Sequence, residues 1–168
     1  ENAVIYEENG VTIRSFPAVH AFDGPVSFRL DWNGRSFVFS SDTFPNRWFN
    51  EYAKNADVVV HECFVSVENL IERMNFPVQR ALLVGAQVHT PPEAFGKVMS
   101  IVEPRMAVAY HFINDFDTVN NVYSGIRSTY DGPLTLARDM LVWNVTADEI
   151  RVREAVFNEN VWTAPIVR

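Results

Sequence analysis

The stretch ADVVVHECF, residues 56–64, decides how the chain is expected to fold. Three successive valines, Val58 to Val60, indicate a strand that is buried in the core of a sheet. His61, Glu62 and Cys63 follow directly, so a strand that avoids water ends in two titratable side chains and a thiol. Ligands in α/β sheets bind beyond the carboxyl ends of the strands. This arrangement therefore predicts a strand whose end reaches the rim of a functional site.

Strand and helix patterns alternate along the rest of the chain. Hairpins are predicted at residues 3–16 and 25–40, each around an Asn-Gly turn. A second buried strand is predicted at residues 105–112, and short strands are predicted from residue 133 onward. Helices are predicted over residues 45–55, 65–74, 77–86, 90–102 (with Thr90 as its cap) and 119–130. This order predicts a layered α/β or α+β fold.

Composition narrows the function classes. The chain has 168 residues, the size of one domain, and its 48% hydrophobic and 21% charged residues are typical of globular proteins. The formal net charge of −7 argues against a general nucleic-acid binder, which normally carries a basic face. A single cysteine excludes an internal disulfide framework. Stability is therefore expected from packing, from metal or from a partner.

The first residues are Glu1-Asn2-Ala3, without an initiator methionine. We therefore expect a processed or trimmed chain that has lost an upstream part, with any address signal it carried. No signal peptide is visible, and no apolar run approaches the ~20 residues of a membrane span. The expected protein is a bacterial-type soluble protein of the cytoplasm or periplasm, and the compartment stays open.

All four histidines share one kind of position. Each follows an apolar segment, as does one aspartate, Asp42. A single histidine at a strand end is most often structural, but the shared placement predicts a common site. Histidine and aspartate together are ligands of zinc and similar divalent metals. No local motif such as HExxH is present, so distant segments must supply the ligands. The four histidines are His20, His61, His89 and His111.

Three motifs between residues 11 and 112 resemble the metallo-β-lactamase superfamily, in the branch that includes RNase Z and arylsulfatase-like and phosphodiesterase-like hydrolases. The segment VTIRSFPAVHAFDGPVSFRLDWNGRSFVFSSDT is similar to a ligand histidine followed by a hairpin and a Ser-Gly-Asp-Thr motif, with Ser41 in place of the glycine. VVVHECF is similar to a His-Glu-Ala-Thr-Phe motif, with Cys63 and Phe64 in place of Ala-Thr. VHTPPEAFGKVMSIVEPRMAVAYHF is similar to a His-Ser/Thr-Thr/Pro motif, the helix after it and the strand that ends in the last histidine ligand.

The resemblance implies a role for each matching residue. His20 would bind one metal, Asp42 would bridge two metals and His111 would bind the second. His89 would donate a proton to the leaving group, and Glu62 would orient and polarise it. The implied cofactors are two divalent metal ions, with Zn²⁺ first and Mn²⁺ or Fe²⁺ as alternatives. The implied reaction is hydrolysis of an ester-type bond (a phosphoester, sulfate ester, carboxylic ester or lactone) by a dimetal-activated hydroxide.

The implied fold is α/β, with residues 1–168 as the C-terminal half of a metallo-β-lactamase αββα sandwich, a mixed sheet with flanking helices. The superfamily's His-X-His-X-Asp-His motif is absent, because no two histidines stand two residues apart. We therefore expect a complementary N-terminal half, cleaved or encoded separately, as partner. A small-molecule ester is the expected substrate, a homo-oligomer is compatible, and neither a membrane nor a nucleic acid is expected. The alternatives are a non-catalytic module of the same fold and, disfavoured by the charge, a tRNA-processing nuclease.

Some interpretations stay open on the sequence alone. His61 is a third catalytic candidate, evenly balanced between supporting the site and simple packing. Cys63 is expected to be an inert buried thiol, because nothing near it in sequence would lower its pKa. Phe44, Trp48 and Phe49 are expected in the core, with a substrate pocket as the alternative. Residues 112–118 either contact substrate or form a solvated loop.

Overall fold

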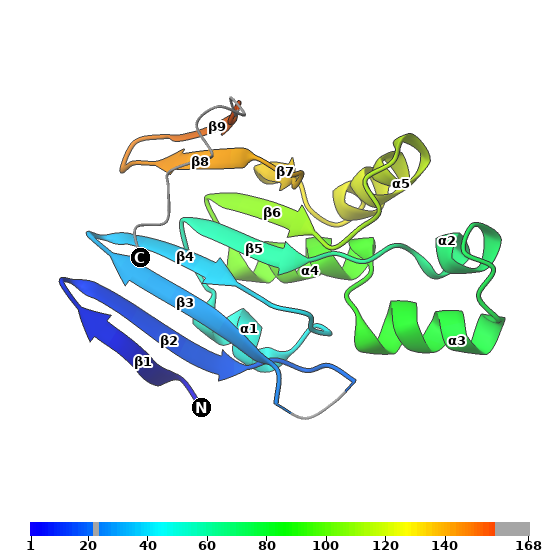
Figure 1. The fold of residues 1–168 in the computed structure, drawn as a ribbon, viewed down its shortest axis with the longest axis horizontal. Helices are drawn as coiled ribbons and strands as arrows, with labels where there is room; N and C mark the ends of the chain where they lie inside the picture. Colours follow the sequence, from blue (N-terminus) through cyan, green and yellow to red (C-terminus); the bar gives the residue numbers. More distant parts are fainter. Residues whose placement is uncertain (22–23, 157–168) are drawn as a thin grey trace, which may run out of the picture.

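A seven-stranded mixed sheet is the centre of the computed structural model, which describes residues 1–21 and 24–156 (Figure 1). Its strands stand side by side in chain order, and a separate two-stranded sheet follows. The seven strands are β1 (Ala3–Glu8), β2 (Val11–Pro17), β3 (Val26–Trp32), β4 (Arg35–Phe39), β5 (Val58–Glu62), β6 (Met106–Tyr110) and β7 (Leu134–Leu136). The second sheet pairs β8 (Leu141–Val145) with β9 (Ile150–Glu154). The predicted α/β class is confirmed.

Both predicted hairpins form. β1 pairs antiparallel with β2, and β3 pairs antiparallel with β4. Asn9 and Gly10 have φ of 52° and 76°, and Asn33 and Gly34 have φ of 48° and 68°. Two successive residues with positive φ are what a two-residue type I′ turn requires, which explains Asn-Gly at both positions.

Strand direction brings distant segments to one edge of the sheet. β4, β5, β6 and β7 run parallel to one another. β2 runs in the same direction, because it is antiparallel to β3 and β3 is antiparallel to β4. The carboxyl ends of β2, β4, β5 and β6 therefore lie at the same edge, where ligands bind in such sheets.

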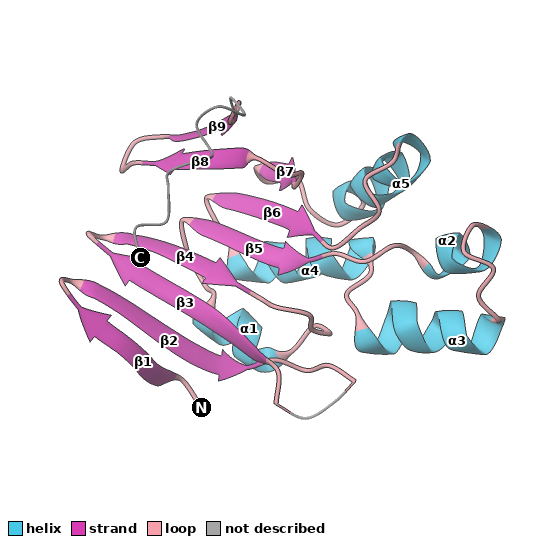
Figure 2. Cartoon of the chain, viewed as in Figure 1, coloured by secondary structure: helices cyan, strands magenta, loops and turns pink. Residues whose placement is uncertain are grey.

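Helices cover one face of the sheet. Figure 2 shows α1 and α4 on the same side of the strands. The main core lies between them and the sheet; it includes Phe49 of α1, Phe95 of α4 and Val59 of β5, all fully buried. Every helix in the described part of the chain is too short or too polar to cross a membrane. The helices are α1 (Arg47–Tyr52), α2 (Val67–Glu72), α3 (Val78–Leu83), the π-helix η1 (Val84–Val88), α4 (Pro92–Val102) and α5 (Phe116–Arg127).

Two helix starts differ from the sequence prediction. α5 begins at Phe116, three residues earlier than expected, because the Asp115 side chain accepts a hydrogen bond from the Thr118 N–H at 2.8 Å. The prediction that Thr90 caps α4 is wrong. The cap position is Pro91, which makes no side-chain cap bond, and the Thr90 hydroxyl instead donates to the Thr43 carbonyl at 2.6 Å. Thr90 therefore joins two loops instead of starting a helix.

The opposite face of the sheet is apolar and incompletely covered. In-register pairs share a face, so Leu30, Phe37 and Val58 lie together on this side. Trp32 on the same face is 54% exposed, and Phe37 is 40% exposed. Val145 of β8 contributes to a small apolar recess over these residues. In the described part of the chain this face is therefore open at Trp32 and Phe37, whereas Val58 is buried.

Candidate metal centre and its acid–base pair

Four sequence-predicted residues lie at or just beyond the carboxyl ends of strands that share an edge of the sheet. Glu62 is the last residue of β5, and His111 directly follows β6. Asp42 and His20 each lie three residues beyond their strands, β4 and β2. His89 directly follows η1, and its ring lies beside the rings of His20 and His111. The structure thus brings together five of the six candidates from segments up to 91 positions apart in the numbering (20 to 111).

Asp42, His89 and His111 form one potential metal-binding group. Each offers a ligand atom, and these atoms lie within 4.8 Å of one another. Nε2 of His111 lies 3.6 Å from Oδ2 of Asp42. His111 has φ of 76°, a left-handed conformation that costs a residue with a Cβ roughly 1–2 kcal/mol. Such strain at a solvent-accessible polar cluster is typical of functional sites.

His20 takes part in a second group, with Glu62 and His89, whose ligand atoms also lie within 4.8 Å of one another. Nδ1 of His20 lies 3.3 Å from the carbonyl oxygen of Val88, the last residue of η1. If Nδ1–H donates to this carbonyl, the opposite nitrogen, Nε2, is free as a ligand. Metal-binding histidines are commonly oriented by such a bond from their second nitrogen.

The Glu62 carboxylate is the centre of a buried hydrogen-bond network. It is fully buried and accepts from three groups that can donate. The Thr43 N–H donates to Oε1 at 2.7 Å, the Thr90 N–H donates to Oε2 at 3.2 Å, and Nδ1 of His89 lies 2.9 Å from Oε1. Buried carboxylates are tolerated when they are satisfied in this way. With Nδ1–H bonded to Glu62, the His89 tautomer leaves Nε2 free to face the site.

Backbone bonds connect the loops that carry the site. The Val19 N–H donates to the Thr43 hydroxyl at 2.9 Å, and the Phe44 N–H donates to the Val19 carbonyl at 2.6 Å. The loop before His20 is therefore fixed against the loop after Asp42. Thr43 lies in the quoted aspartate motif, but its role as a link between loops has no sequence signal, because the partners that make the link, Val19, Glu62 and Thr90, are distant in the chain.

The structure does not bring His61 to this cluster. Its side chain is fully buried on the helix-covered face, with its ring 4.5 Å from Phe49 and 5.8 Å from Phe95. Successive residues of a strand point to opposite faces, so His61 and Glu62 cannot share a side. Burial lowers the pKa of His61, which favours the neutral ring. We therefore correct the catalytic assignment of His61 and assign it to packing, the other interpretation that the sequence left open.

Cys63 is buried, as expected. It is fully inaccessible, and burial raises the pKa of its thiol well above the ordinary value. An inert thiol follows from both observations. Phe49 is likewise in the main core and Trp48 packs against it, which confirms the packing interpretation for these two aromatic residues.

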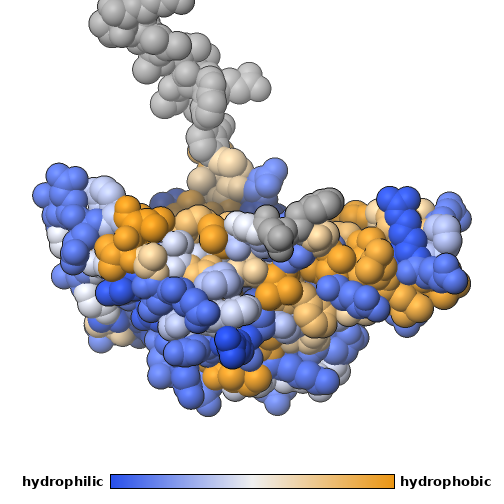
Figure 3. Space-filling model, turned by 90° about the horizontal axis from the view of Figure 1, so that it is seen from below, coloured by the Kyte–Doolittle hydropathy of each residue, from blue (hydrophilic) through white to orange (hydrophobic). Residues whose placement is uncertain are grey.

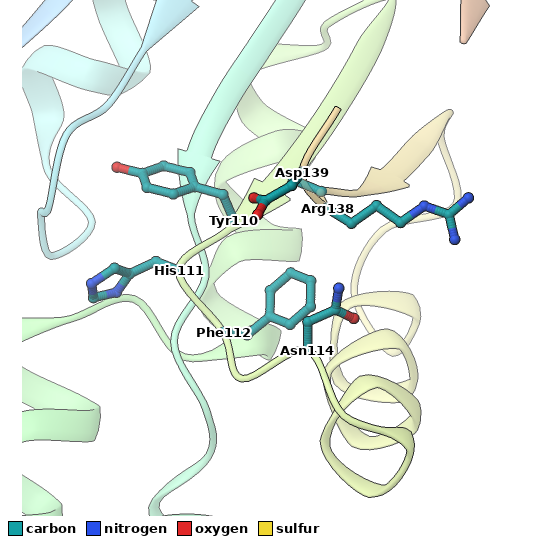
Figure 4. A pocket seen from close by; sticks show the side chains of 7 residues that line it. Tyr110, His111, Phe112, Asn114, Arg138 and Asp139 are labelled. Atoms are coloured by element: carbon teal, nitrogen blue, oxygen red, sulfur yellow. The ribbon is translucent and has the colours of Figure 1, made fainter. Parts of the chain in front are cut away.

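A cavity of about 560 Å³ lies beside His111 (Figure 4). Phe112 and Asn114, which follow the last predicted ligand, line it together with Arg138 and Asp139 beyond β7. In Figure 4 the Tyr110 and His111 side chains extend to one side, away from Phe112 and Asn114. The first part of the 112–118 segment therefore borders an open cavity next to the site. Phe116, in contrast, is strongly exposed.

The donor set suits a divalent metal. Imidazole nitrogens and a carboxylate are the ligands of Zn²⁺ and related ions. The two groups overlap in His89, so the geometry alone permits His89 as a ligand or as a neighbour of the ligands. The orienting bond to His20 and the strained backbone of His111 also fit a metal site.

Comparison with solved structures identifies the fold. YhfI from Bacillus subtilis, a metallo-β-lactamase fold protein, aligns with a TM-score of 0.61 and 15% sequence identity over 79% of this chain and 49% of that chain. The chain has the metallo-β-lactamase fold. Human tRNase Z short form (ELAC1) aligns with a TM-score of 0.54 and 14% identity over 81% of this chain and 42% of that one. The metallo-β-lactamase-fold chain described here thus spans about half the length of these solved structures.

Other comparisons separate the fold from activity. CmlA from Streptomyces venezuelae, a diiron β-hydroxylase, aligns with a TM-score of 0.54 at 8% identity, covering 89% of this chain and 33% of that chain. Neighbours of this metallo-β-lactamase-fold chain therefore carry names of different activities. A ribonuclease Z of Mycobacterium avium (strain 104) is 36% identical over 58 residues, which are 34% of this chain and 21% of that protein. No protein-family model matches the chain.

Proposed function

We propose that this chain is the C-terminal half of a metal-dependent hydrolase of ester-type bonds. One observation carries the proposal: His20, Asp42 and His111 converge beyond parallel strand ends around the Glu62–His89 pair. A packing module needs no such convergence of partly exposed imidazole and carboxylate groups, one of which, His111, has a left-handed backbone conformation.

His20, Asp42 and His111 would hold two divalent metal ions together with ligands from a complementary half. When bound, such ions supply Lewis acidity and a water nucleophile that is active at neutral pH. Glu62 holds His89 in the tautomer with Nδ1 protonated, and Nε2 faces the site. His89 carries a proton on Nε2 to the leaving-group oxygen, and Glu62 stabilises the doubly protonated ring that precedes this transfer. Phosphoesters, sulfate esters, carboxylic esters and lactones all release such an oxygen.

The complementary half would cover the apolar face of the sheet. This face carries Trp32 and Phe37, which are strongly exposed, beside the partly exposed Leu30. In a sandwich of two sheets, the facing sides pack about 10 Å apart and bury such residues. This chain covers about half of each solved structure, so one further half would complete a domain of that size. We refer to the two halves together as the complete assembly.

The test combines metal analysis with an ester panel on the complete assembly. Phosphodiester, phosphomonoester, sulfate ester and lactone substrates are compared between the wild type and an Asp42→Ala variant. We expect turnover of at least one class by the wild type and its loss in Asp42→Ala. An exposed aspartate in the β8–β9 turn, Asp148, gives the matched control, and Asp148→Ala should behave as the wild type. Failure of every substrate with metal fully bound would favour the non-catalytic module.

The aligned ribonuclease Z supports one second candidate, cleavage of an RNA phosphodiester. The net charge of −7 opposes it, because RNA binding relies on neutralising phosphates with basic residues. A tRNA precursor added to the same panel separates the candidates, since an RNA-processing enzyme would cleave it in preference to small esters.

A further inference from the structure

Phe64 lies against two of the predicted site residues. Its ring centroid is 4.5 Å from that of His89, with an angle of 23° between the ring planes, so the two rings are stacked. The Phe64 ring is also 5.3 Å from the His111 ring at 34°. His89 and His111 are themselves 4.9 Å apart. One apolar ring thus contacts both the proposed proton donor and a proposed ligand.

Phe64 is itself held in place. Its N–H donates to the Thr90 carbonyl at 2.8 Å, which ties the end of β5 to the residue after His89. Its side chain packs against the apolar cluster of Val65, Leu70 and Ala81, beneath α2 and α3. Because both the backbone and the side chain of Phe64 are anchored, its ring is a fixed surface for its neighbours.

The His89 ring is constrained in two independent ways. The Glu62 contact at 2.9 Å fixes the direction of Nδ1 within the ring plane. Stacking on Phe64 fixes the orientation of the His89 ring plane. The His20 ring also contacts His89, with ring centroids 4.8 Å apart and an angle of 58° between the ring planes. Rotation about the Cβ–Cγ bond of His89 would disrupt the contacts to both Glu62 and Phe64. The direction of Nε2 is therefore defined only while both contacts persist.

We propose that Phe64 is a positioning residue for His89: its ring holds the imidazole plane so that Nε2 faces the leaving group. The inference rests on the proposed proton-donor role of His89. In the motif that this stretch resembles, threonine stands at this position, so the stacked ring is a feature of this chain. Aromatic pairs favour one arrangement by roughly twofold to tenfold in population. Loss of the ring face should lower the fraction of correctly oriented His89 by a similar factor.

Three variants in the complete assembly test the proposal. Phe64→Leu removes the flat face at similar volume, and Phe64→Tyr keeps it. Phe76→Leu is the matched control, because Phe76 packs against the same cluster but stacks on no histidine in the described part of the chain. For esters with poor leaving groups, we expect Phe64→Leu to lower kcat roughly two- to tenfold with little change in KM. Phe64→Tyr and Phe76→Leu should stay near the wild type. If Phe64→Leu does not fold, Phe64→Met replaces it as a flexible side chain of similar size.

Two further readouts show that Phe64 acts through His89. In a His89→Ala background, Phe64→Leu should produce no additional loss. In NMR spectra of metal-free, histidine-labelled protein, the ring-proton signals of His89 should be shifted by the Phe64 ring current. The signals should move in Phe64→Leu and stay in place in Phe64→Tyr and Phe76→Leu. The His89→Ala spectrum identifies the signals.

Each outcome has a distinct meaning. Unchanged His89 signals in Phe64→Leu, or a kcat loss that Phe76→Leu reproduces, would overturn the positioning role. Full additivity of Phe64→Leu with His89→Ala would overturn it as well. If His89→Ala alone does not lower the turnover of esters with poor leaving groups, the proposed proton-donor role of His89 is wrong. The NMR shifts then show separately whether Phe64 stacks on His89.

Discussion

Nδ1 of His89 lies 2.9 Å from Oε1 of Glu62, and the carboxylate of Glu62 is fully buried. This contact joins the end of β5 to the segment that follows η1, although the two residues are 27 positions apart. A carboxylate partner favours the His89 tautomer with a proton on Nδ1. A ring nitrogen of His89 also lies within 4.8 Å of ligand atoms of Asp42 and His111, the other members of its potential metal-binding group. The proposed acid–base pair and the candidate metal-binding residues are therefore one connected cluster.

His89→Ala should separate catalysis from metal binding. General acid catalysis contributes roughly 10²–10⁴-fold, so turnover of esters with poor leaving groups should fall on that scale in the complete assembly. Nitrophenyl esters, which release a stable anion, should lose less. Metal content, measured by mass spectrometry, should stay near that of the wild type. An emptied metal site would instead identify His89 as a ligand, as the two overlapping groups also allow.

Glu62→Gln should lower both stability and turnover. An amide offers one acceptor oxygen, while the carboxylate accepts from Thr43, Thr90 and His89 through both oxygens. At least one buried donor then lacks a partner, at a cost of about 1–3 kcal/mol in the free energy of unfolding. Urea denaturation followed by circular dichroism measures this cost. Glu72→Gln, on the exposed surface of α2, is the control and should be neutral; equal stability of the two variants would contradict the network.

Ser41 tests the backbone at the aspartate motif. Its φ of 55° is left-handed, which explains why the resembled motif has glycine there. The Ser41 hydroxyl donates to the Val26 carbonyl at 2.7 Å and offsets part of the strain. Ser41→Ala keeps the strain and loses this bond, whereas Ser41→Gly loses the bond and removes the strain. We expect the alanine variant to be less stable than the glycine variant by about 1 kcal/mol in thermal or urea unfolding. The reverse order would exclude the left-handed conformation.

Asp57 provides a pH-dependent part of the stability at the other end of β5. Burial acts to raise the pKa of Asp57, but the hydrogen bonds from Arg105 and the Ser36 N–H, with the charges of Arg35 and Arg105, outweigh it and leave the pKa below 3.8. A pKa that is lower in the folded than in the unfolded state gives stability that is present above pH 3.8 and lost as the pH falls through the folded pKa.

Asp57→Asn should therefore destabilise the complete assembly at pH 7 by about 1–3 kcal/mol, through the loss of charged hydrogen bonds. The difference from the wild type should shrink as the pH falls below 3.8. Measuring the free energy of unfolding of the wild type and of Asp57→Asn between pH 7 and the acid range checks the direction of this change. A difference that is constant with pH, or equal to that of the exposed control Asp148→Asn, would contradict the assignment.

Local sequence signals were sufficient for most of the fold. The two Asn-Gly pairs predicted turns, and the structure has positive φ at both. The run from Val58 to Val60 predicted a buried strand, and it forms a central parallel strand. Both signals depend only on residues that are close in sequence. Thr90 failed as a cap because a distant carbonyl, that of Thr43, competes for its hydroxyl. The apolar pattern before His89 predicted a regular helix, but the chain forms the π-helix η1 there.

The site was predictable only in outline. Residues that follow parallel strands converge, because the strands end at the same edge of the sheet. The alternation of strands and helices in the sequence predicted this. His61 and Glu62 are adjacent in a strand and must face opposite sides, but the sequence did not show which side holds the site. The structure places Glu62 against His89 and His61 against Phe49. The contact between Phe64 and His89 spans two loops, so no spacing in the sequence could indicate it.

Surface composition leaves one region without an assigned role. Figure 3 shows apolar residues at the end of the molecule formed by α3. Val78, Leu82 and Leu83 are all exposed there. This region lies on α3, outside the cluster of His20, Asp42, Glu62, His89 and His111.

Metal stoichiometry of the complete assembly tests the dimetal site most directly. Inductively coupled plasma mass spectrometry should find two divalent ions per assembly in the wild type and in Asp148→Ala. In Asp42→Ala and His111→Ala the content should fall together with ester hydrolysis, because both residues would bind metal. Full occupancy in Asp42→Ala and His111→Ala, or no bound metal in the wild type, would contradict a dimetal site built on these residues.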